Sequence, residues 1–378
     1  MMMANLQFFC LLVCSLAIIK TGCAKDNWVE KTIVKNAISK GAVCLDGSPP
    51  AYHFQSGFGE GVENWIVQLS GGGWCTNVTD CLDRTRSIYV GSTNIMGPWK
   101  FEGLFSINKS ENSDFYNWNK VFVRYCDGGA FTGDVEYVDP ATNLHFRGAR
   151  IFEAVMDELL AKGLKNAKNA LLAGTSAGGY PTMLYCDHFR SLLPKSKRVK
   201  CFADAGHFIH AKNPKQARGF EEVYNALVTL QGSAKALPKA CTSKMNPVLC
   251  FFPENILQHI KTPIFIAMSA YDSFQVNKTL GHDIFSCIFS RTCTSSQNKT
   301  LREFRSEFLT TLPKPHNPLL KGVFIDSFVH HSAIQWRWTI QSGLVVNNVS
   351  APEAFADWYF DQKYWYVIDE KDLPTIPK

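Results

Sequence analysis

Short apolar runs separated by amphipathic segments dominate the hydrophobic pattern of this chain. Each run is bounded by glycine or polar residues and is too short for a typical helix, which favours a buried strand. We expect strands at residues 65–69, 121–125, 169–173, 199–203, 263–268 and 322–325.

Two segments between these runs have the periodicity of amphipathic helices. From about residue 150, apolar side chains recur on one face with acidic residues opposite, and Gly163 follows as a natural stop. Residues 180–193 form the second segment. Strands that alternate with helices predict an α/β fold, with a mostly parallel sheet and helices on both of its faces. No Pro/Ser-rich linker, internal repeat or low-complexity tract marks a boundary, so we expect one domain with insertions.

The run at 169–173 leads directly into a G-x-S-x-G motif centred on Ser176. A serine on a sharp strand-to-helix turn needs small neighbours, because its strained backbone leaves no room for a Cβ beside it. Such a turn exposes the hydroxyl, which suits nucleophilic attack on an ester carbonyl. A glycine-rich turn that carries a serine by chance is the alternative. The position between a strand and a helix favours the catalytic interpretation.

A serine nucleophile needs a base and a carboxylate that orients the base. Three aspartates end apolar runs after the motif, namely Asp204, Asp272 and Asp326. We favour Asp272, because α/β-hydrolases carry their residues in the order Ser, Asp, His along the chain. Asp204 is then expected to be a cap or turn residue, and Asp326 to form local hydrogen bonds.

The candidates for the base are His330 and His331, in the loop after the last apolar run. Two adjacent histidines cannot both face the serine, so one of them is expected to be packed or solvated. No carboxylate or histidine stands at ligand spacing from this pair, so we expect neither a metal site nor another cofactor.

The segment 70–74, Ser-Gly-Gly-Gly-Trp, resembles the glycine-rich loop that supplies an oxyanion-hole donor in lipases and esterases. Glycine lets the backbone approach a reacting carbonyl closely. We expect the amides of Gly73, Trp74 and Ala177 to form the oxyanion hole. A tight turn closed by a disulfide at Cys75 is the structural alternative, and both descriptions can hold together.

The first 24 residues have the pattern of a secretory signal. Residues 6–19 are mostly apolar, and small residues at 22–24 offer a cleavage site. The segment is short for a membrane span, although a retained N-terminal anchor is the alternative. We therefore expect a signal peptide at residues 1–24 and no membrane association after its removal.

The cysteine count supports an oxidising compartment. Thirteen cysteines minus three in the leader leave ten, and an even number in a secreted chain indicates five disulfides. Cys75 with Cys81 and Cys287 with Cys293 are close enough for local loops, but other pairings are equally allowed by the sequence.

Five N-x-S/T sequons point to the same compartment and predict N-glycans at Asn77, Asn108, Asn277, Asn298 and Asn348. The formal net charge is +6 for the whole chain. A mildly basic secreted protein is compatible with a polyanionic partner such as an acidic polysaccharide. No nucleic-acid recognition motif is present, and we expect no nucleic-acid partner.

Six motifs are spread over the chain, at residues 71–75, 124–128, 131–134, 143–148, 174–179 and 271–275. Together they resemble the plant pectin acetylesterases, which are carbohydrate esterases related to the animal deacylase Notum. The resemblance runs from about Cys44 to beyond His331. It implies an α/β-hydrolase-like domain over residues 25–378, a Ser/Asp/His triad, and removal of acetyl groups from homogalacturonan or rhamnogalacturonan in the cell wall.

The family usually carries a cysteine on either side of its histidine, in a pattern close to S-C-F-x-H-C-Q, whereas residues 326–332 here are D-S-F-V-H-H-S. An alignment that puts His331 at the second cysteine selects His330 as the base. Carried over in this way, the resemblance places the nucleophile at Ser176, the acid at Asp272 and the base at His330.

Three functions are compatible with these residues. The leading one is a secreted serine esterase that hydrolyses the acetyl esters of pectin and releases acetate. The second is a carboxylesterase for another acylated glycan or a lipidated protein, which a deep apolar pocket would favour over a short closed one. The third is a catalytically impaired wall-binding relative, suggested by the altered histidine loop.

Overall fold

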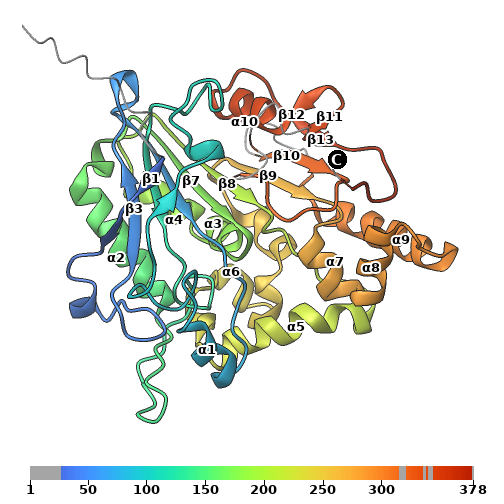
Figure 1. Cartoon of the computed structure of the whole chain (residues 1–378), viewed down its shortest axis with the longest axis horizontal. Coiled ribbons are helices and arrows are strands. Elements are labelled where there is room, and N and C mark those ends of the chain that lie inside the picture. The colour runs from blue at the N-terminus through green and yellow to red at the C-terminus, as the bar shows by residue number, and fades with distance from the viewer. Residues whose placement is uncertain (1–26, 315–320, 335–337, 339–343, 377–378) are drawn as a thin grey trace, which may run out of the picture.

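A nine-stranded sheet runs through the centre of the molecule, as the computed structural model shows (Figure 1). The structure describes residues 27–314, 321–334, 338 and 344–376. The expected signal peptide at 1–24 therefore lies outside the described residues.

The order of the strands places the middle of the chain at the middle of the sheet. From one edge to the other the strands are β13 (Tyr366–Ile368), β10 (Lys321–Asp326), β9 (Ile264–Ser269), β8 (Arg198–Asp204), β7 (Asn169–Thr175), β4 (Asn64–Leu69), β6 (Asn119–Val123), β3 (Ala51–Gln55) and β2 (Lys31–Ile33). All neighbours from β13 to β6 pair in parallel, and β3 is antiparallel to both β6 and β2. The expected mostly parallel sheet is confirmed.

The helices follow the strands in the order typical of an α/β protein. They are α1 (Val78–Arg84), α2 (Gly148–Lys162), α3 (Gly179–Leu184), α4 (Cys186–Leu192), α5 (Pro214–Thr229), α6 (Lys239–Thr242), α7 (Ser273–Leu280), α8 (His282–Ser290), α9 (Ser295–Thr311) and α10 (Ala351–Tyr359). Two short ribbons, β1 (Trp28–Val29) with β5 (Trp99–Lys100) and β11 (Val345–Val346) with β12 (Val349–Ser350), lie outside the main sheet. Within the described ranges, no helix has the length and apolar character needed to cross a membrane.

Alternating side chains along the strands build two core layers, one on each face of the sheet. Val67 and Leu172 belong to the layer that also contains apolar side chains from α2, α3, α4, α5, α7 and α9. Their neighbours Ile66 and Leu171 point the other way, toward α10 and aromatic side chains of the segment 101–118. Strands that are apolar on both faces are expected for a parallel sheet covered on both sides.

One predicted helix is wrong in its continuity. The segment expected at 180–193 forms α3 and α4, which are separated at Tyr185. The Tyr185 ring stacks on Phe152 with centroids 4.0 Å apart, and its hydroxyl donates to the Phe131 carbonyl at 2.8 Å. These tertiary contacts of Tyr185 accompany the break, and they are invisible in the helical periodicity.

All ten cysteines outside the leader form disulfides, as expected. The pairs are Cys44–Cys126, Cys75–Cys81, Cys186–Cys201, Cys241–Cys250 and Cys287–Cys293. Two of them are the local loops that the spacing allowed. Cys44–Cys126 closes a separation of 82 residues, which no local pattern could have predicted.

Candidate active site

Ser176 stands on a strained turn at the carboxyl end of β7. Its φ of 57° lies in the left-handed region, which non-glycine residues rarely adopt outside special sites. A Cβ on Gly174 would overlap the Gly178 carbonyl, and one on Gly71 would lie 2.7 Å from the Ser176 Cβ. The glycines therefore make room for the turn that presents this hydroxyl.

His331 connects this serine to a buried carboxylate. Its Nε2 lies 2.7 Å from the Ser176 Oγ, and its Nδ1 lies 2.7 Å from the Asp272 Oδ2. Asp272 is buried at the start of α7, where its Oδ1 also accepts the Gln275 amide at 2.9 Å. The helix thus fixes the carboxylate that in turn fixes the ring.

The assignment of His330 to this position is wrong. His330 turns away from Ser176 into the protein, where its Nε2 lies 3.0 Å from the Asp326 Oδ2 and its Nδ1 lies 3.2 Å from the Ser332 carbonyl. Asp326 ends the neighbouring strand β10 and is buried with it. Each histidine therefore has its own aspartate, and only His331, the partner of Asp272, reaches the serine.

The family pattern fits the histidine loop in two registers, one of which points to His331. Counted without a gap from Ser327, S-C-F-x-H-C-Q reaches its histidine at His331. Phe328 and Ser332 then stand at the two cysteine positions. The other register begins at Asp326 and matches the Phe of the pattern to Phe328 and its His to His330, but the structure brings His331 to the serine.

Asp204 joins the serine strand to the histidine loop. Its carboxylate accepts the Thr175 hydroxyl at 2.9 Å, the Ala333 amide at 3.0 and 3.1 Å and the Ile334 amide at 3.1 Å. Burial raises the pKa of this carboxyl, although those donors favour its charged form. Asp204 is therefore more than a local cap, since it holds two functional loops in register.

Burial and charge act in opposite directions on His331. Burial disfavours the imidazolium and lowers the pKa, whereas the charge and hydrogen bond of Asp272 raise it. The net result is a pKa above the ordinary value of 6.5. A ring that readily accepts a proton beside a serine hydroxyl can act as a general base.

The glycine-rich loop after β4 is held by its carbonyl groups. The Gly72 and Trp74 carbonyls accept from the Arg84 guanidinium at 2.6 and 2.8 Å, and the Gly73 carbonyl accepts from the Tyr125 hydroxyl at 2.6 Å. In a trans peptide the N–H points opposite to the C=O. Anchoring the Gly72 and Gly73 carbonyls therefore orients the amides of Gly73 and Trp74 away from these anchors.

A cavity of about 460 Å³ opens beside the serine. Gly71, Gly73, Ser176, Phe274 and His331 belong to its lining, together with the cationic side chains of Arg84 and Arg124.

Trp74 belongs to an aromatic cluster whose members Phe208 and Phe274 lie next to the His331 ring. It is buried, and its ring packs at 5.6 to 6.2 Å against the rings of Phe208, Phe220, Tyr224 and Phe274. These side chains therefore form a filled aromatic wall beside His331.

Comparison with known proteins identifies the family. The pectinacetylesterase family profile matches residues 23–378. This chain belongs to that family. It is 42% identical to pectin acetylesterase 7 of Arabidopsis thaliana over 369 residues, which cover 95% of this chain and 93% of the relative. Pectin acetylesterase 11 of the same plant is also 42% identical, over 363 residues.

Animal carboxylesterases are more distant relatives. The palmitoleoyl-protein carboxylesterase Notum of Mus musculus is 27% identical over 286 residues, covering 72% of this chain and 56% of the relative. Among solved structures, the Wnt deacylase Notum from Drosophila superposes with a TM-score of 0.76 at 22% identity, covering 92% of this chain and 97% of the other. The expected α/β-hydrolase-like fold is thereby confirmed.

Proposed function

We propose that this protein is a serine esterase that hydrolyses acetyl esters of pectin, with Ser176 as nucleophile, His331 as base and Asp272 as the orienting acid. The observation that carries the proposal is the continuous chain of two 2.7 Å contacts from Ser176 through His331 to Asp272, in a member of the pectinacetylesterase family. Relatives named pectin acetylesterase match nearly the whole chain, which supports the same substrate class here.

The first half of the reaction forms an acetyl-enzyme. Ser176 Oγ attacks the acetyl carbonyl carbon while His331 Nε2 takes the hydroxyl proton, and Asp272 stabilises the resulting imidazolium. The tetrahedral intermediate then collapses, and His331 returns the proton to the departing sugar oxygen.

The second half releases acetate. Water enters the open cavity, gives its proton to His331 Nε2 and attacks the acetyl carbon. The ester bond to Ser176 breaks, the serine recovers its proton, and acetate leaves.

The oxyanion of both tetrahedral intermediates needs donors that are already in place. We assign this role to the amides of Gly73, Trp74 and Ala177. The carbonyl anchors at Arg84 and Tyr125 support the assignment, because they hold the first two amides in fixed directions before substrate arrives. Removing one such donor typically costs about 3 kcal/mol in the barrier.

The aromatic wall around Trp74 favours a short acyl group. An acetyl methyl needs little space, whereas a fatty acyl chain would have to displace the buried rings of Phe208, Phe220 and Tyr224. This packing argues against a long acyl chain on the Trp74 side of the serine.

Secretion fits the same proposal. Five disulfides indicate an oxidising compartment. Of the five sequon asparagines, Asn77, Asn108, Asn277 and Asn348 are exposed, and Asn298 is half-buried. We propose that the chain reaches the cell wall after removal of residues 1–24, with N-glycans on these exposed positions.

Acetate release from acetylated pectin tests the proposal, with Ser176→Ala as the inactive variant. Ser191→Ala is the matched control, because Ser191 lies exposed on α4. We expect wild type and Ser191→Ala to release acetate equally, and Ser176→Ala to lose roughly 10⁴-fold or more in rate. No release by wild type would contradict the function, and equal release by Ser176→Ala would contradict the mechanism. A series of aryl esters from acetate to octanoate adds a test of acyl length, and a preference for octanoate would favour the lipid alternative.

A further inference from the structure

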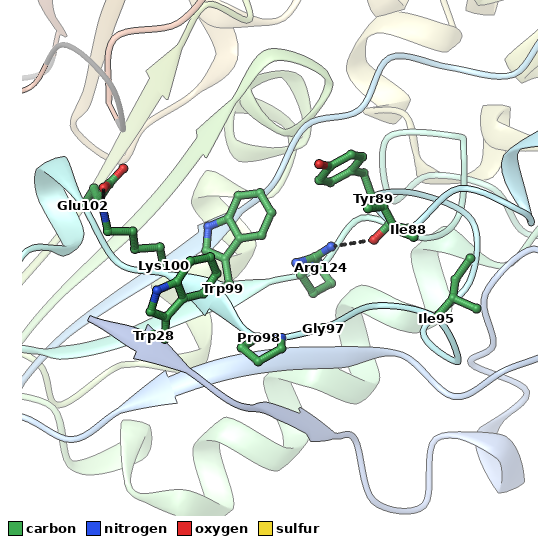
Figure 2. A pocket seen from close by; sticks show the side chains of 10 residues that line it. All are labelled: Trp28, Ile88, Tyr89, Ile95, Gly97, Pro98, Trp99, Lys100, Glu102 and Arg124. Carbon is green, nitrogen blue, oxygen red and sulfur yellow. Dashed lines mark hydrogen bonds and ion pairs between the residues drawn. The ribbon is translucent and has the colours of Figure 1, made fainter. Parts of the chain in front are cut away.

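A second cavity of about 640 Å³ adjoins the one at the serine. The two share Tyr89, Trp99 and Arg124 in their linings. Figure 2 shows the indoles of Trp28 and Trp99 on one side of Arg124 and the phenol of Tyr89 on the other. A ligand at Ser176 that is longer than one unit can therefore continue into this second cavity, which we call the Trp99 cavity.

Exposed apolar side chains gather around the Trp99 cavity. Trp28, Ile88, Tyr89 and Ile95 all line it, with exposed fractions of 57%, 54%, 61% and 44%. A cluster of large apolar side chains on the surface is a common mark of a binding site. Flat aromatic faces that carry a polar edge suit a ligand that is apolar on one side and polar on the other, as a sugar ring is.

Arg124 supplies a fixed positive charge at the boundary of the two cavities. The residue is only 3% exposed, and its guanidinium lies 4.5 Å from the centre of the Trp99 ring. Trp99 itself stacks on Phe122 at 5.1 Å, so this platform is rigid. The Nη2 of Arg124 donates to the Ile88 carbonyl at 3.2 Å.

No acidic side chain among the described residues forms an ion pair with Arg124. Burial lowers the pKa of its guanidinium to about 10, so the group still carries its charge at neutral pH. A buried charge normally has an anionic partner, because desolvation without one is costly. Arg124 therefore lacks the carboxylate that its position calls for.

The sheet sets the spacing of the strand ends that carry Arg124 and Ser176. Ser176 follows β7 and Arg124 follows β6, with β4 between them. Since neighbouring strands lie about 4.8 Å apart, the two strand ends are separated by about 10 Å. Arg124 and Ser176 thus start from strand ends two strands apart, and both border the cavity at the serine.

We propose that the Trp99 cavity is a subsite for an uronate residue next to the acetylated sugar, with Arg124 binding its carboxylate and Trp28 and Trp99 stacking on the sugar rings. The proposal rests on the proposed function. It adds that the enzyme recognises a free carboxylate next to the acetyl ester that it hydrolyses. A guanidinium binds a carboxylate through paired, charge-assisted hydrogen bonds. Methyl esterification of that carboxylate would remove the charge and one acceptor.

The kinetic test compares acetylated polygalacturonate that carries free carboxylates with the same polymer after methyl esterification. We expect wild type to prefer the free acid by at least about tenfold in kcat/KM, and Arg124→Gln to lose that preference. Arg124→Lys keeps the charge but lacks the paired N–H donors of the guanidinium, and its preference is expected to fall between those of wild type and Arg124→Gln. Arg86→Gln is the matched control, because Arg86 precedes the cavity residues Ile88 and Tyr89, is 81% exposed and lines neither cavity. Equal rates of wild type on both polymers would overturn the subsite.

A binding test separates the subsite from the chemistry. Unacetylated trigalacturonate is titrated calorimetrically into Ser176→Ala and into the Ser176→Ala/Arg124→Gln and Ser176→Ala/Trp28→Ala variants. We expect a loss of affinity of about tenfold or more on removal of Arg124 and several-fold on removal of Trp28. The Trp28 variant alters an exposed residue, so it remains informative if the buried arginine is needed for folding. No binding by Ser176→Ala would overturn the subsite, whereas binding without any acetate release by wild type would contradict only the proposed function.

Discussion

Two Asp–His pairs stand side by side in this protein, one at the serine and one beneath it. One pair is His331 with Asp272, and the other is His330 with Asp326. The two histidines are adjacent in the loop, and the two aspartates come from the ends of the neighbouring strands β9 and β10. The side chain of His331 is 26% exposed and reaches the catalytic cavity, whereas that of His330 is 6% exposed. The same two residue types therefore meet in two different environments.

The hydrogen bonds assign a different protonation state to each ring. His331 donates from Nδ1 to Asp272 and leaves Nε2 to accept the serine proton, which requires the neutral ring. His330 faces two acceptors, the Asp326 carboxylate and the Ser332 carbonyl, and this arrangement favours the imidazolium, which carries a proton on each nitrogen. One pair is built to exchange a proton, and the other is built to keep it.

The largest expected difference is in activity when each histidine is replaced by glutamine. His331→Gln removes the base and is expected to lower kcat/KM for an aryl acetate by roughly 10⁴-fold, with the free energy of unfolding little changed. His330→Gln is expected to lower it by less than about tenfold, because His330 does not touch the serine. Kinetics on both variants, with denaturant unfolding as the companion measurement, check the comparison. A larger activity loss in His330→Gln than in His331→Gln would reverse it.

The aspartates are expected to divide in the same way, one affecting stability and the other activity. Asp326→Asn leaves a buried imidazolium without its counter-ion and is expected to cost about 3 kcal/mol in the free energy of unfolding. Asp272→Asn is expected to keep the loop folded while lowering kcat by roughly 10⁴-fold, because the amide no longer holds the reactive tautomer. Urea unfolding and steady-state kinetics measure the two quantities. If Asp326→Asn unfolds at the same denaturant midpoint as wild type, the structural role of the inner pair is refuted.

The smallest expected effect is a separation of two pH dependences. The pKa of each ring is raised above 6.5, since burial is outweighed by the neighbouring carboxylate. Activity needs neutral His331, so kcat/KM should rise with pH through a value above 6.5.

Stability from His330 follows the opposite course. Its contribution is complete below the unfolded pKa of about 6.5 and is lost as pH rises through the higher pKa of the folded state. Unfolding experiments from pH 5 to pH 9 should show this loss in wild type and a flatter profile in His330→Gln. A profile that is unchanged in His330→Gln would assign the titration to another group.

Local sequence was sufficient for the features that depend on neighbouring residues. Six of the nine sheet strands and the glycine-flanked turn at Ser176 follow from spacing and residue type. Cys75–Cys81 and Cys287–Cys293 were two of the pairings that the spacing allowed. Asp272 was also predicted, because α/β-hydrolases carry their residues in the order Ser, Asp, His along the chain.

The choice between His330 and His331 depended on partners that are distant in sequence. Which side chain turns toward Ser176 is decided by the positions of Asp272 at the start of α7 and Asp326 at the end of β10, and by Asp204 binding the amides that follow the loop. A periodic pattern cannot distinguish adjacent positions in an irregular segment, since no repeat defines their faces.

From the sequence alone came six of the nine sheet strands, the elbow and its serine, because backbone sterics and apolar patterning act over a few residues. Only the tertiary structure decided which histidine meets the serine and which cation borders both cavities. Those outcomes depend on side chains from distant segments, such as Trp28, Trp99 and Arg124, that approach one another only after the sheet has formed.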